Sequence, residues 1–263
     1  MPAGIPILMY HEVGPIETLA ERYTVPDAMF RQQLQYLRDH GFQTLSLEQF
    51  FRAASANGAG TCDKMVVITF DDNNICHFAA TTPILIEFNF RATFFIVSAF
   101  LDTKPGMLNS AQLVQMSKAG MHIESHSHTH RFLSELDLNE LREELATSRR
   151  VLEERVQTEV RFISCPGGRY NSSVLDAALD LGYLGVCTSA PGLNASAPGE
   201  PPRMLNRFLI SATTTLETFE RIVNGDERYI RGEVLRHRAK GLVKALLGNE
   251  RYDRLWRRYR RNV

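Results

Sequence analysis

The sequence predicts one α/β domain built from parallel strand–helix units. Short runs of β-branched and aromatic residues alternate along the chain with longer stretches in which apolar residues recur every three or four positions. This alternation is typical of a parallel sheet with helices outside it. The length of 263 residues suffices for one large domain with a full hydrophobic core.

The expected strands are short apolar runs bounded by loop residues. They cover residues 5–10, 42–45, 65–70, 92–97, 121–125, 160–164, 183–187 and 205–210. The expected helices carry an apolar stripe, and some have clear boundary residues, such as Asp137 as an N-cap and Gly41 as a stop. They cover residues 27–40, 47–54, 78–88, 110–119, 137–157 and 172–181. Two segments rich in small residues are expected as loops, residues 55–63 and a rim or lid at 191–202.

Composition argues against several classes of protein. Hydrophobic residues make up 44% and charged residues 23% of the chain, as in ordinary globular proteins. No run approaches the roughly 20 apolar residues that a membrane-spanning helix needs. The N-terminus lacks a basic segment followed by a long apolar core, so we expect no secretory signal and a cytoplasmic protein. Four cysteines lack metal or disulfide spacing, so reduced thiols are expected at Cys62, Cys76, Cys165 and Cys187.

The C-terminal part of the chain is strongly basic. Residues 228–263 hold 12 Lys and Arg against 3 Asp and Glu, a net charge of +9 in a chain whose formal net charge is zero. Interleaved apolar and basic residues suit amphipathic helices that lie on an anionic membrane. The alternative is that the apolar stripe packs on the domain and the charges are solvated. We therefore expect a domain over residues 1–215, a basic helical tail over residues 216–263, and no nucleic acid partner.

Two adjacent carboxylates and a pair of histidines carry the chemistry. Asp71 and Asp72 end the apolar run 65–70, and His126 and His130 follow the run 121–125. Because successive strand side chains point to opposite faces, one Asp can hold a metal while its neighbour turns toward a water molecule. One carboxylate with two imidazoles is a common ligand set for catalytic zinc. The alternative is that the Asp pair caps a helix and the histidines lie on a solvated loop, but the combination at strand ends predicts the metal site of a hydrolase.

The same motifs resemble the polysaccharide deacetylases, carbohydrate esterase family four. The resemblance lies in three blocks and covers about residues 5–210. The blocks are residues 66–72 with 91–97, residues 121–130, and residues 165–171. The resemblance implies a distorted barrel of parallel strands with outer helices, and an enzyme that removes N-acetyl groups from sugars.

The resemblance also assigns roles to single residues. It makes Asp71 the catalytic base and makes Asp72, His126 and His130 the ligands of one divalent ion, expected to be zinc. The backbone N–H of Gly167 takes the place of the family's oxyanion donor, although a plain turn is the alternative interpretation of residues 166–168. The neighbouring residues expected to contact substrate are Pro166, Gly168, Arg169 and Tyr170.

The leaving amine needs a proton, and the position of the general acid is unusual. Many family members use a histidine late in the domain, but after His130 this chain has only His237, in the basic tail. Residues 6–11 resemble instead a branch of exopolysaccharide N-deacetylases in which the acid histidine comes first. His11 follows a strand and is our candidate acid, with a structural histidine as the alternative. The remaining histidines are expected near the ligands without binding the metal (His128), as a core or packing residue on a strand (His122), or at the periphery (His77 and His40).

The chain departs from the family pattern at three points. Asn73 replaces the usual Gly after the Asp pair, and Asn tolerates a positive φ. Ser164 replaces the Arg that tunes the base, and Arg169 or Arg207 are candidates to substitute for it. The Asp/Trp pair that lines the substrate groove in many members is not recognisable, because Trp256, the one Trp, lies in the tail.

Three functions compete on this evidence. The first is a metal-dependent N-deacetylase acting on an acetylated amino-sugar glycan or its lipid-linked precursor, placed at the inner membrane face by the tail. The second is an amidase for a small N-acyl or cyclic amide on the same scaffold. The third is a non-catalytic carbohydrate-binding relic, which the missing Arg favours and the intact Asp and His motifs oppose.

Overall fold

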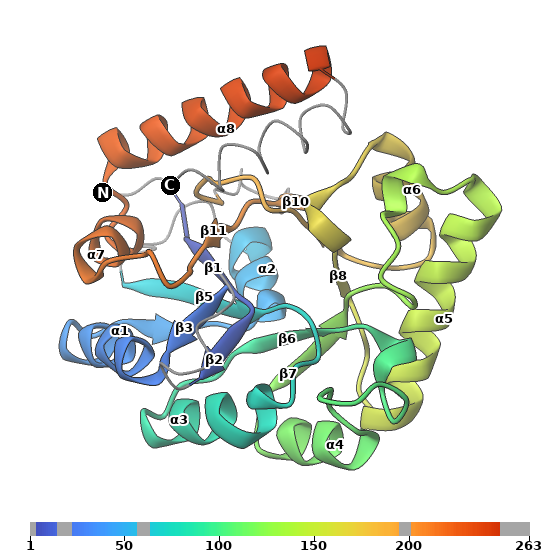
Figure 1. Cartoon of the computed structure of the whole chain (residues 1–263), viewed down its shortest axis with the longest axis horizontal. Coiled ribbons are helices and arrows are strands. Elements are labelled where there is room, and N and C mark those ends of the chain that lie inside the picture. The colour runs from blue at the N-terminus through green and yellow to red at the C-terminus, as the bar shows by residue number, and fades with distance from the viewer. Residues whose placement is uncertain (1–3, 15–22, 57–63, 195–200, 248–263) are drawn as a thin grey trace.

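The computed structural model describes residues 4–14, 23–56, 64–194 and 201–247. Within these residues, nine strands form one parallel sheet in the order β10-β9-β8-β7-β6-β5-β1-β11, with β4 also paired to β5 (Figure 1). The strands are β1 (Ile7–Tyr10), β4 (Gln43–Thr44), β5 (Met65–Phe70), β6 (Thr93–Ile96), β7 (His122–Ser125), β8 (Phe162–Ser164), β9 (Gly185–Cys187), β10 (Met204–Leu205) and β11 (Phe208–Leu209). The predicted parallel α/β architecture is therefore confirmed.

The sheet curls until its two edges nearly meet. β10 lies at one edge and β11 at the other, yet only Asn206 and Arg207 separate these strands along the chain. The single strand predicted for residues 205–210 was wrong for this reason: the chain crosses the seam of the barrel there. Asn194 ties the seam, because its backbone pairs with Ile5 and its side chain bonds the backbone N–H and C=O of Asn206.

The helices cover the outside of the curled sheet (Figure 1). They are α1 (Asp27–Asp39), α2 (Leu47–Ala56), α3 (Thr82–Glu87), α4 (Ser110–Lys118), α5 (Leu138–Val156), α6 (Ser172–Asp180), α7 (Leu216–Val223) and α8 (Glu227–Leu247). Asp137 caps α5 as predicted, accepting the N–H groups of Asn139 and Glu140. Two features were not predicted: a π-helix (His77–Thr81) before α3, and a small parallel pair β2 (Glu12–Gly14) and β3 (Thr24–Pro26).

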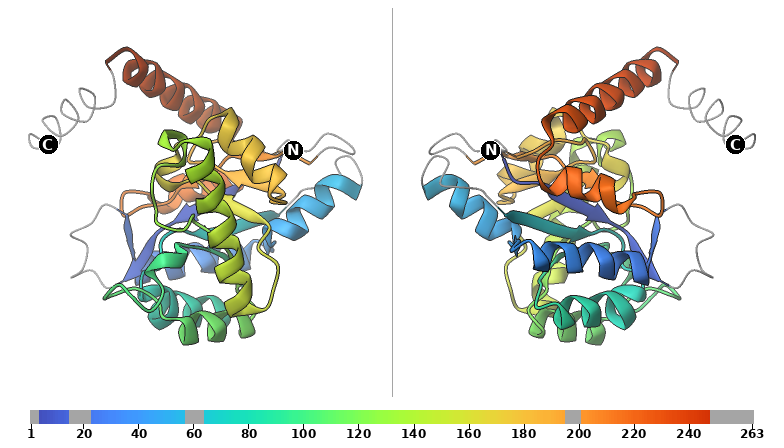
Figure 2. Two further views of the ribbon diagram at one scale, coloured as in Figure 1. Left: turned by 90° about the vertical axis from the view of Figure 1, so that its right-hand side faces the viewer. Right: turned by 90° about the vertical axis from the view of Figure 1, so that its left-hand side faces the viewer.

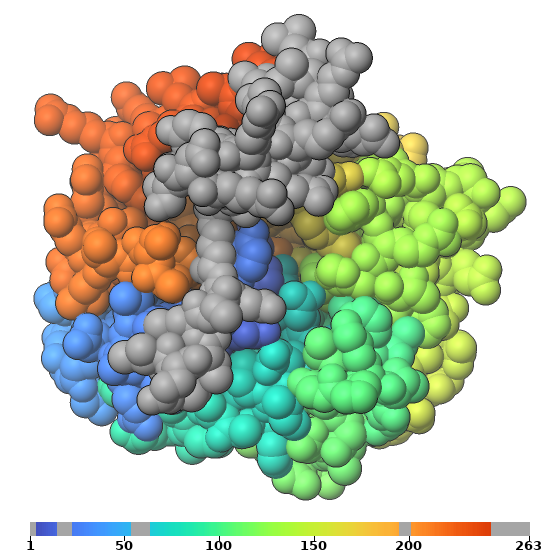
Figure 3. All heavy atoms as spheres, in the orientation of Figure 1, coloured from blue at the N-terminus to red at the C-terminus, as the bar shows by residue number. Residues whose placement is uncertain are grey.

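Strand alternation divides the core into two layers. Along β5, Val66 and Ile68 belong to the larger cluster between sheet and helices, whereas Val67 belongs to the cluster inside the barrel with Phe95 and Phe162. Continuing this alternation past the strand puts Asp71 on the same side as Val67, toward the barrel interior. In Figure 3, dark blue atoms of the N-terminal segment show deep between the surrounding parts of the same face.

The basic tail begins as packed helix and continues as exposed helix. Ile230 is buried and Val234 packs against the core, but Leu235 and Leu242 are 64% and 67% exposed. Figure 2 shows α8 leaning out from the body toward its C-terminal end. Residues 248–263, with Trp256, lie outside the described part, as does Cys62 in the segment 57–63. Among the described residues, no helix is both long and apolar enough to cross a membrane.

Candidate metal and acid–base site

The Asp pair sits where β5 ends and the chain turns sharply. Asp72 has a left-handed backbone, with φ of +65°, so the positive φ that we expected Asn73 to tolerate falls one residue earlier. Asn73 is instead fully buried, and its side-chain amide bonds both the N–H and the C=O of Val97 at 2.9 Å. These two bonds fix the end of β5 to the end of β6. Asp71 and Asp72 therefore occupy a rigid turn and point to different places.

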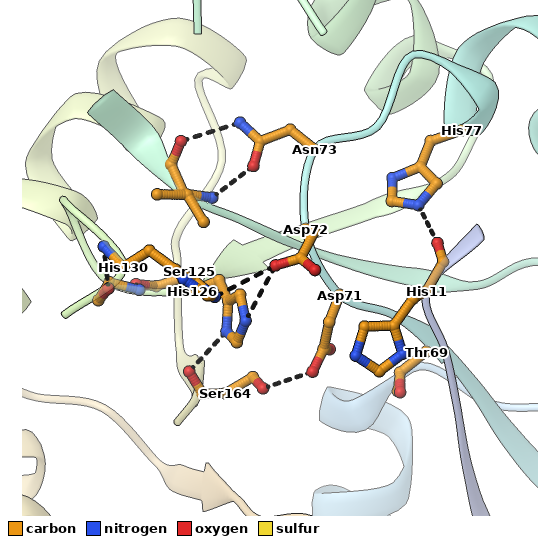
Figure 4. Close-up of polar contacts among 12 residues, drawn as sticks. His11, Thr69, Asp71, Asp72, Asn73, His77, Ser125, His126, His130 and Ser164 are labelled. Atoms are coloured by element: carbon orange, nitrogen blue, oxygen red, sulfur yellow. Dashed lines mark hydrogen bonds and ion pairs between the residues drawn. The ribbon is translucent and has the colours of Figure 1, made fainter. Parts of the chain in front are cut away.

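Asp72, His126 and His130 converge as predicted (Figure 4). Oδ1 of Asp72 lies 3.5 Å from Nε2 of His126 and 3.2 Å from Nε2 of His130, and one ligand atom from each of the three lies within 4.8 Å of the other two. A tetrahedral ion with bonds of about 2.0–2.2 Å separates its ligands by roughly 3.3–3.6 Å. The spacing therefore suits one small divalent ion. Both histidines lie on the loop after β7, not on a helical turn.

The protonation of His126 also suits metal binding. Its Nδ1 hydrogen bonds the carbonyl of Ser164 at 2.8 Å, so Nδ1 carries the hydrogen and Nε2 keeps a free lone pair on the side of Asp72. Burial lowers the pKa of His126 below its usual value. The neutral imidazole that a metal requires is therefore the favoured form, and the donor set fits a divalent ion such as zinc.

Asp71 is held by an ion pair inside the barrel. Arg207 bonds it at two points, Nη1 to Oδ1 and Nη2 to Oδ2, each at 2.7 Å, and the hydroxyl of Ser164 donates to Oδ2 at 3.0 Å. Burial alone would raise the pKa of Asp71, but the Arg207 guanidinium and its hydrogen bonds hold this pKa well below its usual value. Of the two candidate arginines, Arg207 is therefore the one that pairs with Asp71. Arg169 does not, because it pairs with Glu135.

His11 lies next to Asp71 at the end of β1 (Figure 4). Its ring stacks on Tyr23, with centroids 4.8 Å apart, and its Nδ1 is buried without a hydrogen-bond partner among the described residues. The structure therefore brings the candidate acid and the candidate base together.

His77 was wrongly predicted to be peripheral. It is fully buried in the π-helix, and its ring packs against Phe70 and Phe94 with centroids 5.6 and 5.2 Å away. Burial lowers its pKa to about 4, so the ring is neutral, and Nε2 bonds the carbonyl of His11 at 2.6 Å (Figure 4). π-Helical turns often lie at functional sites. The sequence offered no signal for this one beyond the histidine itself.

Three further histidines lie outside the candidate site. The positions of His128 and His40 agree with the prediction, and that of His122 does not. His128 is half-buried and its Nδ1 bonds the hydroxyl of Ser98 at 2.8 Å, so it sits near the ligands without joining them. His40 is exposed at the end of α1. His122, predicted to be a core or packing residue, is exposed at the amino end of β7. It lines a cavity of about 460 Å³ at the end of the barrel opposite the metal ligands, because its strand starts there.

The third motif forms a tight glycine turn beside the site. Gly167 and Gly168 have φ of +62° and +66°. A Cβ on Gly167 would lie 2.8 Å from the ring of Phe132, and one on Gly168 would clash with the hydroxyl of Ser189. Arg169 covers the Phe132 ring at 3.9 Å. The N–H of Gly167 lies in the first turn of a 3₁₀-helix, where no partner exists within the helix.

Two aromatic side chains near the site, Phe132 and Tyr23, were not predicted. Phe132 and Tyr23 are 36% and 40% exposed, and each touches a candidate functional residue, Gly167 or His11. Exposed aromatic rings beside a polar centre are typical of ligand sites. Tyr170, which was predicted to contact substrate, is 42% exposed. The contacts of Phe132 and Tyr23 could not be predicted from sequence spacing, because their partners come from other segments of the chain.

Comparisons with known proteins agree with this architecture. The sequence model of the polysaccharide deacetylase family matches residues 58–186. YxkH of Bacillus subtilis is 31% identical over 191 residues, which is 73% of this chain and 66% of that protein. The poly-β-1,6-N-acetyl-D-glucosamine N-deacetylase of Escherichia coli is 32% identical over 101 residues, 38% of this chain and 15% of that enzyme. The chain therefore spans less than two thirds of either relative.

A solved structure extends the likeness over most of the chain. The Streptococcus pyogenes deacetylase PplD, in complex with acetate, superposes with a TM-score of 0.76 at 31% identity, covering 85% of this chain and 99% of that one. The predicted distorted barrel of parallel strands is thereby confirmed. By its motifs, its fold and these relatives, the chain belongs to the polysaccharide deacetylase family.

Proposed function

We propose that this protein is a metal-dependent carbohydrate N-deacetylase, which hydrolyses the N-acetyl group of an amino sugar in a glycan or its lipid-linked precursor. One observation carries the proposal: an ionised Asp71 lies in the turn that also holds Asp72, the ligand that faces His126 and His130. Relatives support the chemistry. The PplD structure holds acetate, which is the product of deacetylation, and the Escherichia coli relative is an N-deacetylase of an amino-sugar polymer by name.

Asp71 accepts the proton of the attacking water in this proposal. A divalent ion held by Asp72, His126 and His130 would polarise the acetamido carbonyl and lower the pKa of water to about 7. Arg207 and Ser164 keep Asp71 ionised and fix both of its oxygens. The low pKa of Asp71 makes it a weak base, so proton transfer depends on a water that is already acidic.

His11 supplies the proton that the leaving amine needs. Its ring is held between Tyr23 and the site, and its backbone carbonyl is tied by His77. The N–H of Gly167 is the candidate donor to the oxygen that becomes negative when the carbonyl is attacked. Gly167 and Gly168 leave no room for a side chain of their own in this turn, because a Cβ at either position would meet Phe132 or Ser189. Acid, base and oxyanion donor thus come from three different strand ends, as in other parallel barrels.

The structure removes the argument that favoured a non-catalytic relic. That argument depended on the missing arginine at Ser164, but Arg207, from the seam of the barrel, forms an ion pair with Asp71. The remaining competitor is an amidase for small N-acyl or cyclic amides. Measured acetate release from N-acetylated oligosaccharides and from small N-acetyl amides distinguishes them. The proposal expects turnover of the sugar substrates and little or none of the small amides, and the reverse preference would overturn it.

We also propose that the enzyme is cytoplasmic and that its basic tail holds it at the anionic inner membrane surface. Leu235 and Leu242 are exposed and seven residues apart, so they share one side of α8. Exposed basic side chains at Arg231, Arg236 and Arg238 accompany them. Each Lys or Arg near an anionic lipid surface contributes about 1 kcal/mol. The first turns of α8, which carry the buried Ile230, pack on the body, and the exposed residues 235–242 are left to bind lipid.

A further inference from the structure

The loop that carries both histidine ligands has an unfavourable backbone. Ser127 and His130 have φ of +65° and +66°, a left-handed conformation in which the Cβ of an L-residue crowds the following carbonyl. Such a backbone persists only where the surroundings hold it in place. Contacts from outside the loop must therefore hold it in the shape that aims Nε2 of His126 and Nε2 of His130 at Asp72.

Helix α5 supplies the restraint through a buried carboxylate. Oε2 of Glu144 accepts the N–H of His128 at 3.0 Å and the N–H of Thr129 at 2.9 Å, and Oε1 accepts the hydroxyl of Thr129. Glu144 is only 7% exposed. All three donors lie between His126 and His130, so one side chain fixes the span that joins the two ligands.

One turn further along α5, Ser148 completes the restraint. Its hydroxyl donates to the carbonyl of Ser127 at 3.0 Å and pairs with the hydroxyl of Ser125 at 2.8 Å. Ser148 is fully buried. Within the loop itself, the hydroxyl of Ser127 accepts the N–H of His130 at 3.1 Å. The left-handed turn at Ser127 is thus held by hydrogen bonds to both its backbone carbonyl and its hydroxyl.

We propose that Glu144 is a positioning residue for the metal centre, holding the ligand loop in its binding shape before any ion arrives. The inference rests on the proposed metal site. A loop shaped in advance loses little conformational freedom on binding, which raises affinity for the ion. Without the carboxylate, two N–H groups and one hydroxyl lose their acceptor, and the two left-handed residues relax toward ordinary backbone angles. The imidazoles then no longer converge on Asp72.

Helix α5 also offers a matched control. Glu153 accepts a backbone N–H from Val160 at 3.0 Å and pairs with Arg149. Glu153 therefore restrains the loop after α5 through a backbone N–H, as Glu144 restrains the ligand loop. Both lie on the same helix, but Glu153 is away from the metal ligands. Loss of either carboxylate removes a loop restraint, and only Glu144 restrains the ligands.

The test is zinc affinity, measured by competition with a chromogenic chelator on protein stripped of metal. Glu144→Ala is expected to weaken binding about 10–100-fold, as removal of residues that orient ligands typically does. Glu144→Gln should recover part of this loss, because its amide oxygen still accepts the two N–H groups. Glu153→Ala should bind as the wild type does. The absorption spectrum of bound Co²⁺ should change in Glu144→Ala alone.

Each outcome decides the proposal. Wild-type affinity in a folded Glu144→Ala, or an equal loss in Glu153→Ala, overturns it. If Glu144→Ala does not fold, Glu144→Gln and Ser148→Ala take its place, and unchanged affinity in both contradicts the proposal. A wild-type protein that binds no zinc or other divalent ion overturns the proposed function itself, whereas failure of the positioning role leaves wild-type binding intact.

Discussion

Arg207, which lies in the seam of the barrel, forms a two-point ion pair with Asp71, with both N–O distances at 2.7 Å. Arg207 comes from the two residues that join β10 to β11, the opposite edges of the sheet. The pair therefore couples the closure of the barrel to the ionisation of the candidate base. Its side chains are 1% and 4% exposed, so solvent cannot replace either partner.

Loss of Arg207 should raise the pH at which activity disappears. In Arg207→Met, burial dominates and raises the pKa of Asp71, so the acidic limb of the pH dependence of kcat/KM should move to higher pH. An unpaired buried charge also costs about 3–5 kcal/mol of stability. Arg207→Lys should recover charge but not the two-point geometry. A pH profile that stays in place in both variants would show that Arg207 does not tune Asp71.

His11 should matter only when the leaving group needs a proton. His11→Ala is expected to lower turnover of an N-acetylated oligosaccharide by about 10²–10⁴-fold, the usual range for general acid catalysis. Cleavage of 4-nitrophenyl acetate should fall far less, because nitrophenolate leaves without protonation. Metal content should stay at the wild-type level. An equal loss on both substrates would assign His11 a structural role.

His77 should stabilise the fold in a pH-dependent way. Its folded pKa is about 4 against an ordinary value of 6.5, so the unfolded chain binds a proton first as pH falls. Stability from this group is complete above about pH 6.5 and is lost as pH falls toward about 4. His77→Phe removes this dependence and leaves the carbonyl of His11 unpaired, which costs about 1–3 kcal/mol at pH 7. Urea unfolding at pH 7 and pH 5 measures both effects. An unchanged difference between the two pH values would contradict the prediction.

The tail should bind anionic vesicles at low salt. Flotation with phosphatidylserine-containing vesicles is expected to carry the wild-type protein, and high salt or truncation after Asn224 should release it. Leu235→Ser combined with Leu242→Ser should weaken flotation without unfolding, because both side chains are exposed. Neutral vesicles serve as the control. A wild-type protein that stays unbound at low salt would exclude the membrane role.

The metal ligands could be predicted because their signal is local. Asp72, His126 and His130 each follow a strand, and parallel strands bring their carboxyl ends to one edge. The alternation that buries Val67 inside the barrel also directs Asp71 inward. These conclusions need only residue types and a strand period of two.

Other parts of the site depend on contacts that sequence does not encode locally. From the sequence, Arg207 and Arg169 were alternative partners of Asp71, and nothing in it could decide between them. The contact between Arg207 and Asp71 depends on how the sheet closes. His77 was misplaced because a π-helix has no clear periodicity in five residues. Glu144 looked like one more charge on a long helix, and only its three bonds to the ligand loop distinguish it.

The most direct test of the account measures acetate release and bound metal in the same samples. An N-acetylglucosamine oligosaccharide is the substrate, and zinc-reconstituted wild type, Asp71→Asn and His126→Ala are compared. The account predicts one ion per chain and acetate release for the wild type, a retained ion without measurable release for Asp71→Asn, and loss of both for His126→Ala. Asp71→Asn working at the wild-type rate, or His126→Ala keeping both metal and activity, would contradict it.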